Sequence, residues 1–193
     1  MDFKSQLELY KKRIDQELAL FLTKKVESAK DLFLKYCYKS IKEYILMGGK
    51  RLRPALVVAT YKALKGQDPD SIYKAALSVE LFHNYTLIHD DIIDEDFLRR
   101  GQPGMNQKLL NYFSEHSEEH EYQGKIFHRN SSRFIVTNAV LAGNILRAWG
   151  TELLSDSSFN SEQIAKVLTI YNTVDRIVNE GQVLDNYFEI SKN

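Results

Sequence analysis

Acidic side chains gather in residues 90–94, which read Asp-Asp-Ile-Ile-Asp. At about 100° per helical residue, Asp90 and Asp94 lie one turn apart on the same face, with Asp91 at its edge. Stacked carboxylates repel one another and destabilise a helix unless a cation lies between them. Few, hard oxygen ligands suit Mg²⁺, which fills its coordination shell with water and substrate phosphate. The spacing therefore predicts a magnesium site formed by Asp90, Asp91 and Asp94.

Basic side chains form a second group in residues 48–54, which read Gly-Gly-Lys-Arg-Leu-Arg-Pro. Lys50, Arg51 and Arg53 lie between the expected end of one helix and the start of the next. Backbone amides and guanidinium groups at such a junction suit a polyanion such as diphosphate. From these residues alone, a basic loop that neutralises the end of the preceding helix is an equally good interpretation.

A histidine connects the two groups. His83 precedes Asp90 by seven residues, which places it within about 20° of Asp90 around a helix. His83, Leu87, Asp90 and Asp94 therefore form one stripe. An acidic face exposed only to solvent would not explain why Asp90 follows an apolar stretch, or why Arg99-Arg100-Gly101 comes directly after the acidic segment.

Two further metal-ligand patterns are weaker. His116 and His120 are four residues apart and could share a helix face, but no third ligand lies nearby and solvated charge is the simpler interpretation. Glu80 and His83 match the Glu-x-x-His pattern of binuclear metal bundles, which requires a second such pair that the sequence lacks.

The elements that would carry these residues are helices. Glycine and proline are scarce, with 9 and 3 residues in a chain of 193, and no alternating apolar pattern suggests a strand. Six helices are expected: 3–28, 31–47, 54–65, from 70 or 71 to about 97, 132–149, and one from Asn160 onward. Residues 101–131 are predicted to be an exposed polar segment, either a loop or insertion or a frayed helix. We therefore expect a single all-α domain spanning 1–193.

Composition excludes several functional classes. Lysine and arginine total 26, as do aspartate and glutamate, so the net charge gives no reason to expect binding to nucleic acid. No apolar run approaches the roughly 18 residues of a membrane span, and the N-terminal residues do not resemble a signal peptide. A single cysteine, Cys37, is typical of the reducing cytoplasm, where we expect the protein to act.

Four blocks together resemble the trans-isoprenyl diphosphate synthase family, also called polyprenyl synthetases. They are 48–54, 80–83, 90–94 with 99–101, and Gly-Gln-Val-Leu-Asp at 181–185. The resemblance covers roughly residues 40–190. It implies an isoprenoid-synthase-type helical bundle whose central cavity holds two diphosphates. It also implies Mg²⁺, a homodimer, and condensation of an allylic diphosphate with isopentenyl diphosphate.

The resemblance also assigns roles to residues. The residues implied to hold isopentenyl diphosphate are Lys50, Arg53, His83 and Arg100. The residues implied to bind Mg²⁺ on the allylic diphosphate are Asp90, Asp91 and Asp94. Arg99 matches an arginine that contacts the allylic diphosphate, and acts with Asp90 and Asp94 in catalysis. Gln182 and Asp185 lie three apart on the last helix, so they can line the wall of the same cavity.

Tyr85 and Thr86 bear on product length. In the family, bulky side chains one to two turns before the first aspartate form the floor of the pocket for the growing chain. Here Tyr85 lies five residues before Asp90, and the smaller Thr86 lies four before it. One ring without a bulky neighbour predicts a short product, C15 to C20, with C20 favoured.

The sequence also departs from the family pattern. Residues 101–106 read Gly-Gln-Pro-Gly-Met-Asn where the family has Gly-x-Pro-Thr-x-His, and Gly143-Asn144 replaces a Gly-Asp pair. The family's second aspartate-rich motif is not found in these 193 residues, which alone are therefore expected to be inactive. A catalytically incomplete or partner-dependent subunit is therefore the alternative to an active synthase. A terpene cyclase would share the aspartates but has no use for Lys50, Arg53 and His83.

Overall fold

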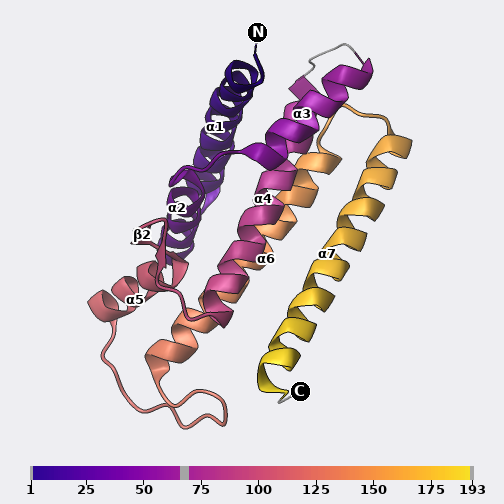
Figure 1. Ribbon diagram of the computed structural model, residues 1–193. Coiled ribbons are helices and arrows are strands. Elements are labelled where there is room, and N and C mark those ends of the chain that lie inside the picture. The colour runs from indigo at the N-terminus through magenta and orange to yellow at the C-terminus, as the bar shows by residue number, and fades with distance from the viewer. Residues whose placement is uncertain (1, 66–69, 192–193) are drawn as a thin grey trace.

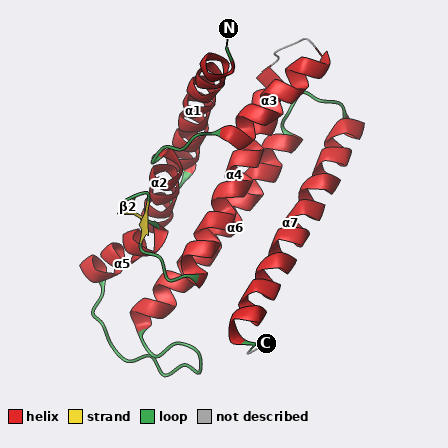
Figure 2. Ribbon diagram, in the orientation of Figure 1, coloured by secondary structure: helices red, strands yellow, loops and turns green. Residues whose placement is uncertain are grey.

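The computed structural model describes residues 2–65 and 70–191, and this part of the chain is almost entirely helical (Figures 1 and 2). Its helices are α1 (Phe3–Ser28), α2 (Leu32–Leu46), α3 (Leu52–Lys65), α4 (Asp70–Ile93), α5 (Met105–His116), α6 (Asn130–Ser155) and α7 (Ser161–Ile190). A two-residue antiparallel pair, β1 (Leu98–Arg99) and β2 (Gln102–Pro103), follows α4. The all-α prediction is confirmed, with seven helices in the described residues where about six were expected.

Helix α4 is the centre of the bundle. It packs along α6 and against α3, while α1 and α2 cover one flank and α7 lies along the other (Figure 1). The side chains with no exposed surface come from several helices and form one cluster, which includes Ile14, Leu18, Ile41, Leu81, Ile88 and Leu146. Because α4 contributes to this core along most of its length, its C-terminal end holds a fixed position relative to α3 and α6.

Local sequence signals explain several helix ends. Asp31 caps α2 by accepting a hydrogen bond from the Leu34 amide at 2.9 Å. Asn160 and Gln163 form a reciprocal capping box at the start of α7, where a helix was expected from Asn160 onward. Gly48 and Gly49 follow α2 with φ of 101° and 142°, a conformation that glycine adopts without steric cost.

Other boundaries differ from expectation. Helix α3 begins at Leu52, two residues before Pro54, which is tolerated because the first turn of a helix needs no amide donors. Helix α4 ends at Ile93 instead of about residue 97, because Glu95 takes a positive φ of 54° and the chain turns into β1. Gly150 lies inside α6 and does not end it. The predicted end of the third helix at Gly66, and the turn expected at 67–69, lie outside the described residues.

The prediction of an exposed loop or frayed helix over residues 101–131 is wrong for residues 105–116, which form the packed helix α5. Met105, Leu109 and Phe113 recur at four-residue spacing, are buried, and hold α5 against the bundle. The exposed connection is confined to residues 117–129. Because α5 ends at His116, that residue and His120 do not share a helix face, so the proposed histidine pair does not form.

No helix in the described ranges 2–65 and 70–191 has both the length and the apolar character needed to cross a membrane.

Candidate active site

A cavity of about 500 Å³ lies among α3, α4 and α7. It brings together Arg53 from α3, His83 and Asp90 from α4, and Gln182 from α7. Leu87 lines it as well, so the stripe predicted from helical periodicity faces one cavity. Four of the predicted site residues, which span 130 positions of sequence from 53 to 182, therefore meet around one space.

Arg53 and His83 form the basic side of this cavity. Arg53 Nη1 donates a hydrogen bond to His83 Nε2 at 3.3 Å. Partial burial lowers the pKa of His83, and the charge of Arg53 lowers it further. A neutral imidazole can accept this hydrogen bond, so the pair presents the guanidinium charge next to a polar ring. This arrangement suits an anionic ligand.

Asp90 and Asp94 form the acidic end. Although α4 ends at Ile93, the Asp94 amide still donates to the Asp90 carbonyl at 2.9 Å, so the two residues remain one turn apart. Burial raises the pKa of Asp90, and the neighbouring charge of Asp94 raises it further. In the described part of the chain, neither carboxylate has a hydrogen bond or ion pair from another side chain.

These two carboxylates fit a magnesium ion. Within the described residues, no three His, Cys, Asp or Glu side chains converge as a complete protein cage for a metal. Mg²⁺ does not need one, because it is commonly held by one or two carboxylates, with water and substrate phosphates completing the shell. Asp90 and Asp94, mutually repelling and unpaired, are the residues that would hold it.

Asp91 points into the bundle and away from the cavity. Its side chain is 1% exposed, accepts a hydrogen bond from the Tyr44 hydroxyl at 2.8 Å, and pairs with Arg99 at 2.9 Å. Burial raises the pKa of Asp91, although these two partners oppose the effect. With both oxygens engaged, Asp91 anchors the end of α4 and orients Arg99. The predicted role of Asp91 as a metal ligand therefore lacks the geometry that Asp90 has.

The three cations of the basic segment have different surroundings. Lys50 and Arg53 are exposed. Arg51 is 3% exposed, and its guanidinium contacts Asp15 at 2.8 Å, Glu80 at 2.5 Å and the Ile45 carbonyl at 2.8 Å. Arg51 therefore stabilises the junction between α2 and α3, while Lys50 and Arg53 remain available to a ligand.

The contact between Arg51 and Glu80 argues against the binuclear metal site that the Glu-x-x-His pattern suggested. Glu80 Oε1 accepts hydrogen bonds from Arg51 and from Asn84, the latter at 3.1 Å. Glu80 is buried in this network, whereas His83 lines the cavity and contacts Arg53. The two members of the Glu-x-x-His pattern thus have separate environments.

Arg100 joins the basic side of the site. Its guanidinium donates to the Gly48 carbonyl and lies over Gly49, where an added Cβ would be 3.1 Å from Arg100 Nη2. The hairpin that follows α4 therefore returns Arg100 to the junction that carries Lys50. Neither Lys50 nor Arg100 is among the residues that line the cavity, so their predicted place in the acceptor site stays a prediction.

On α7, Gln182 lines the cavity, but the exposed Asp185 does not. The charge of Asp185 is nevertheless close enough to contribute to the raised pKa of Asp90. The structure therefore gives Gln182 a place in the cavity wall and gives Asp185 a position at its edge.

Tyr44 and Asn106 are positioning residues that the sequence did not indicate. Asn106 Nδ2 donates to the carbonyls of Asp91 and Asp96, at 2.7 and 2.8 Å, and so holds the turn that carries Asp94. Tyr44 holds Asp91 from 47 residues away. Neither residue has a local signal for this role, because each acts on a segment that only the tertiary fold brings near.

The fold and these residues define a helical bundle with one cavity that has a basic side, Arg53 and His83, and an acidic side, Asp90. The family model for "Polyprenyl synthetase" matches residues 35–193. The chain belongs to the polyprenyl synthetase family, as the sequence motifs predicted.

Individual relatives agree with this assignment. The chain is 35% identical over 163 residues to geranylgeranyl diphosphate synthase of Saccharolobus solfataricus, covering 81% of this chain and 41% of the relative. It is 35% identical over 177 residues to short chain isoprenyl diphosphate synthase of Methanocaldococcus jannaschii, covering 92% and 43%. Among solved structures, geranylgeranyl pyrophosphate synthase of Corynebacterium glutamicum, complexed with isoprenyl diphosphate and magnesium, superposes with a TM-score of 0.80 at 26% identity. That match covers 100% of this chain and 52% of the other. The chain thus spans about two fifths to one half of the length of these relatives.

Proposed function

We propose that this chain carries the binding sites for both substrates of a trans-prenyltransferase, which condenses an allylic diphosphate with isopentenyl diphosphate. The observation that carries the proposal is the shared cavity, in which the Arg53–His83 pair faces the same space as Asp90. An acidic cluster and a basic cluster around one cavity can hold two diphosphates, one through a metal and one through cations directly. A terpene cyclase, which ionises a single diphosphate, would not use the basic half.

The C–O bond of the allylic diphosphate breaks, and diphosphate departs with the electron pair. The double bond of isopentenyl diphosphate attacks the resulting carbocation and forms the new C–C bond. A proton is then lost to the departed diphosphate, so no protein base is required. Charge placed around the leaving group lowers the barrier to ionisation.

We propose separate roles for the acidic and the basic residues of this site. Asp90 and Asp94 would hold Mg²⁺, which neutralises the leaving diphosphate when it is bound. Arg99, oriented by Asp91, would contact the same diphosphate. Lys50 and Arg53 would hold isopentenyl diphosphate with its double bond towards the allylic carbon, an effect of proximity. The residues proposed to complete this acceptor site and the cavity wall are His83, Arg100, Gln182 and Asp185.

Several wider features belong to the same proposal. A short product, C15 to C20, agrees with relatives named for geranylgeranyl and farnesyl diphosphate.

We propose a cytoplasmic homodimer, and the exposed Val140 and Leu141 of α6 provide apolar surface for such an interface. Sedimentation of the full-length protein tests the dimer, and a monomer at tens of micromolar would exclude it.

Lys50→Ala or Arg53→Ala is expected to weaken isopentenyl diphosphate binding while leaving allylic diphosphate binding nearly unchanged. Each substitution removes a charge-assisted contact to one ligand only, and loss of such a contact costs roughly 1.5–3 kcal/mol, or about 10- to 150-fold in Kd. Calorimetric titration of each ligand, with Mg²⁺ present, measures the two affinities separately. Lys62→Ala, at the far end of α3, is the charge-matched control. Equal losses for both ligands would show that the basic segment does not select the acceptor.

A further inference from the structure

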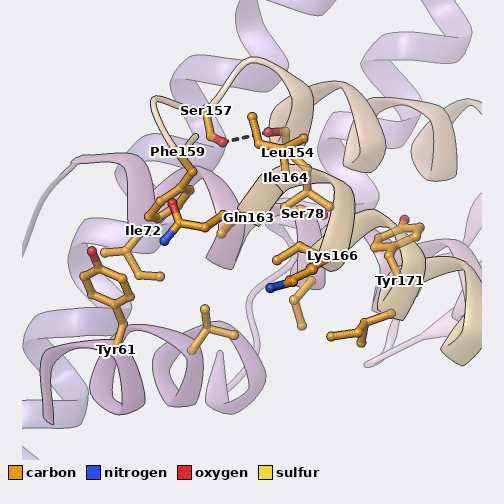
Figure 3. Close-up of a pocket in the computed structure, with 15 residues that line it drawn as sticks. Tyr61, Ile72, Ser78, Leu154, Ser157, Phe159, Gln163, Ile164, Lys166 and Tyr171 are labelled. Carbon is orange, nitrogen blue, oxygen red and sulfur yellow. Dashed lines mark hydrogen bonds between the residues drawn. The ribbon is translucent and has the colours of Figure 1, made fainter. Parts of the chain in front are cut away.

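Helix α7 borders two cavities in succession. Its first turns, between residues 163 and 171, line a second cavity of about 480 Å³, which is walled on the other side by α3 and α4 (Figure 3). Residues between 174 and 182 line the cavity of about 500 Å³ that Arg53, His83 and Asp90 also line. Because these spaces separate α7 from α3 and α4 along much of its length, close packing alone does not fix the position of α7.

Two buried residues attach α7 to the bundle, at the place where the two cavities meet. Among the 30 residues of α7, all of which the structure describes, only Tyr171 and Asp175 are buried, and they are one turn apart. The Tyr171 hydroxyl donates to the Arg147 carbonyl at 3.4 Å and lies over Gly150, where an added Cβ would be 2.7 Å from it. Tyr171 is therefore a packing contact with α6, whereas Asp175 brings a charge into the interface.

Asp175 is held by side chains of two other helices. One carboxylate oxygen pairs with the guanidinium of Arg147 on α6, and the other accepts a hydrogen bond from the hydroxyl of Tyr85 on α4. Asn179, one turn further along α7, donates to that hydroxyl at 3.0 Å and to Asp175 at 3.1 Å. We call these four residues the α7 clamp.

The hydroxyl of Tyr85 acts as a donor in the α7 clamp. Tyr85 is 3% exposed and lines neither cavity. Burial and the hydrogen bond to Asp175 raise the pKa of Tyr85 to about 12, so the hydroxyl keeps its proton at neutral pH. The buried carboxylate of Asp175 therefore receives donors from both a guanidinium and a hydroxyl, which compensate its charge. The α7 clamp thus joins α4, α6 and α7 through directional bonds.

Gln182 lies two turns after Asp175 on the same helix. Seven residues at about 100° each return to within about 20° of the starting direction, so Asp175 and Gln182 share one face of α7. A rotation of α7 about its own axis would therefore displace Gln182 from the cavity. Hydrogen bonds resist such a rotation because they depend on direction, whereas apolar burial does not.

We propose that Asp175 is a positioning residue for prenyl transfer: through Arg147 and Tyr85 it fixes the rotation of α7 and thereby holds Gln182 in the cavity wall. This inference rests on the proposed function. Asp175 itself does not contact substrate, because it is buried and lines neither cavity. Its effect on the reaction therefore depends on Gln182.

Spin labels measure the orientation of α7 independently of activity. Cysteines replace Lys24, exposed on α1, and Glu189, exposed in the last turn of α7, in the full-length protein with Cys37→Ser. Double electron–electron resonance is expected to give a narrow distance distribution when the α7 clamp is intact. Asp175→Ala is expected to broaden or displace that distribution, because α7 loses its directional bonds.

Two further variants complete the distance measurement. Glu180→Ala removes an exposed carboxylate of the same helix, which pairs only with the surface residue Arg176 among the contacts of the described chain, and is expected to leave the distribution unchanged. Arg147→Met breaks the α7 clamp from α6 and is expected to act like Asp175→Ala, so it serves if that variant does not fold. An unaltered distribution in a folded clamp variant would overturn the proposal.

A double-mutant cycle tests the dependence on Gln182. Asp175→Ala and Gln182→Ala are each expected to lower kcat/KM for the allylic diphosphate about tenfold, since small misplacements at a reacting site are costly. The double variant is expected to lose about as much as either single variant, whereas independent effects would multiply to about 100-fold. A 100-fold loss would give Asp175 a general structural role and overturn the proposal. If the unsubstituted protein incorporates no isopentenyl unit, prenyl transfer itself is refuted, while the spin-label distances still decide whether Asp175 orients α7.

Discussion

Asp90→Asn is expected to lower kcat for prenyl transfer about 100-fold or more. Asp90 faces the cavity without a side-chain partner in the described residues, next to Asp94, and is positioned to hold the cation on the leaving diphosphate. Asparagine keeps the shape of the side chain but removes the charge. Loss of a single group that stabilises charge in a transition state typically costs about 10²–10³ in kcat. Steady-state kinetics at saturating Mg²⁺ measure the effect.

Asp96→Asn is the matched control for this experiment. Asp96 is an exposed carboxylate six residues away, in the turn after α4, and its contact with Asn106 uses the backbone carbonyl, which the substitution preserves. We expect its kcat to stay within about threefold of the unsubstituted enzyme. If Asp90→Asn were equally mild, the acidic end of the cavity would not be the site of ionisation.

Arg51→Ala is expected to lower the free energy of unfolding by about 3–5 kcal/mol. The substitution leaves Glu80, a buried carboxylate, without its guanidinium partner, and breaking a buried ion pair from one side typically costs this amount. Asp15 and the Ile45 carbonyl lose partners in the same step. Urea unfolding of the full-length protein, followed by far-ultraviolet circular dichroism, measures the change.

Two further variants separate this effect from general sensitivity to mutation. Arg176→Ala removes an exposed pair with Glu180, and such surface pairs contribute at most about 1 kcal/mol. Arg51→Met with Glu80→Leu replaces the buried pair by apolar groups and is expected to recover most of the lost stability. A loss of less than about 1 kcal/mol for Arg51→Ala would mean that Glu80 is not dependent on Arg51.

The helix starts and the shared face of α4 could be predicted because both depend on local sequence signals. The period of the α-helix placed His83, Leu87 and Asp90 on one face, and that face lines the cavity. Capping residues such as Asn160 located helix starts because their hydrogen bonds are local. The buried residues of α5, Met105, Leu109 and Phe113, follow the same period, but the polar residues between them concealed the helix.

The burial of Arg51 and the inward orientation of Asp91 could not be predicted, because both depend on residues from other helices. Lys50, Arg51 and Arg53 are adjacent in sequence and chemically alike, yet only Arg51 is buried, because its partners Asp15 and Glu80 come from α1 and α4. Asp91 adjoins Asp90 but turns inward to Tyr44 of α2. Local spacing carries no information about such partners.

The predicted role of Tyr85 as the pocket floor also depended on long-range contacts that the sequence does not reveal. Tyr85 and Phe82 are both aromatic residues close before the first aspartate, and the sequence favoured Tyr85. Its partners Asp175 and Asn179 lie on α7, 90 and 94 positions further along the chain, and Tyr85 does not line the cavity.

The condensation assay tests the central claim most directly. The full-length protein is incubated with radiolabelled isopentenyl diphosphate and an allylic diphosphate, with Mg²⁺ or with excess EDTA, and extractable prenyl products are counted after dephosphorylation. We predict incorporation that requires the allylic partner and Mg²⁺ and that is abolished or strongly reduced by Asp90→Asn. Absence of incorporation by a folded, full-length protein supplied with C5, C10 and C15 allylic diphosphates would contradict the assignment of this cavity to prenyl transfer.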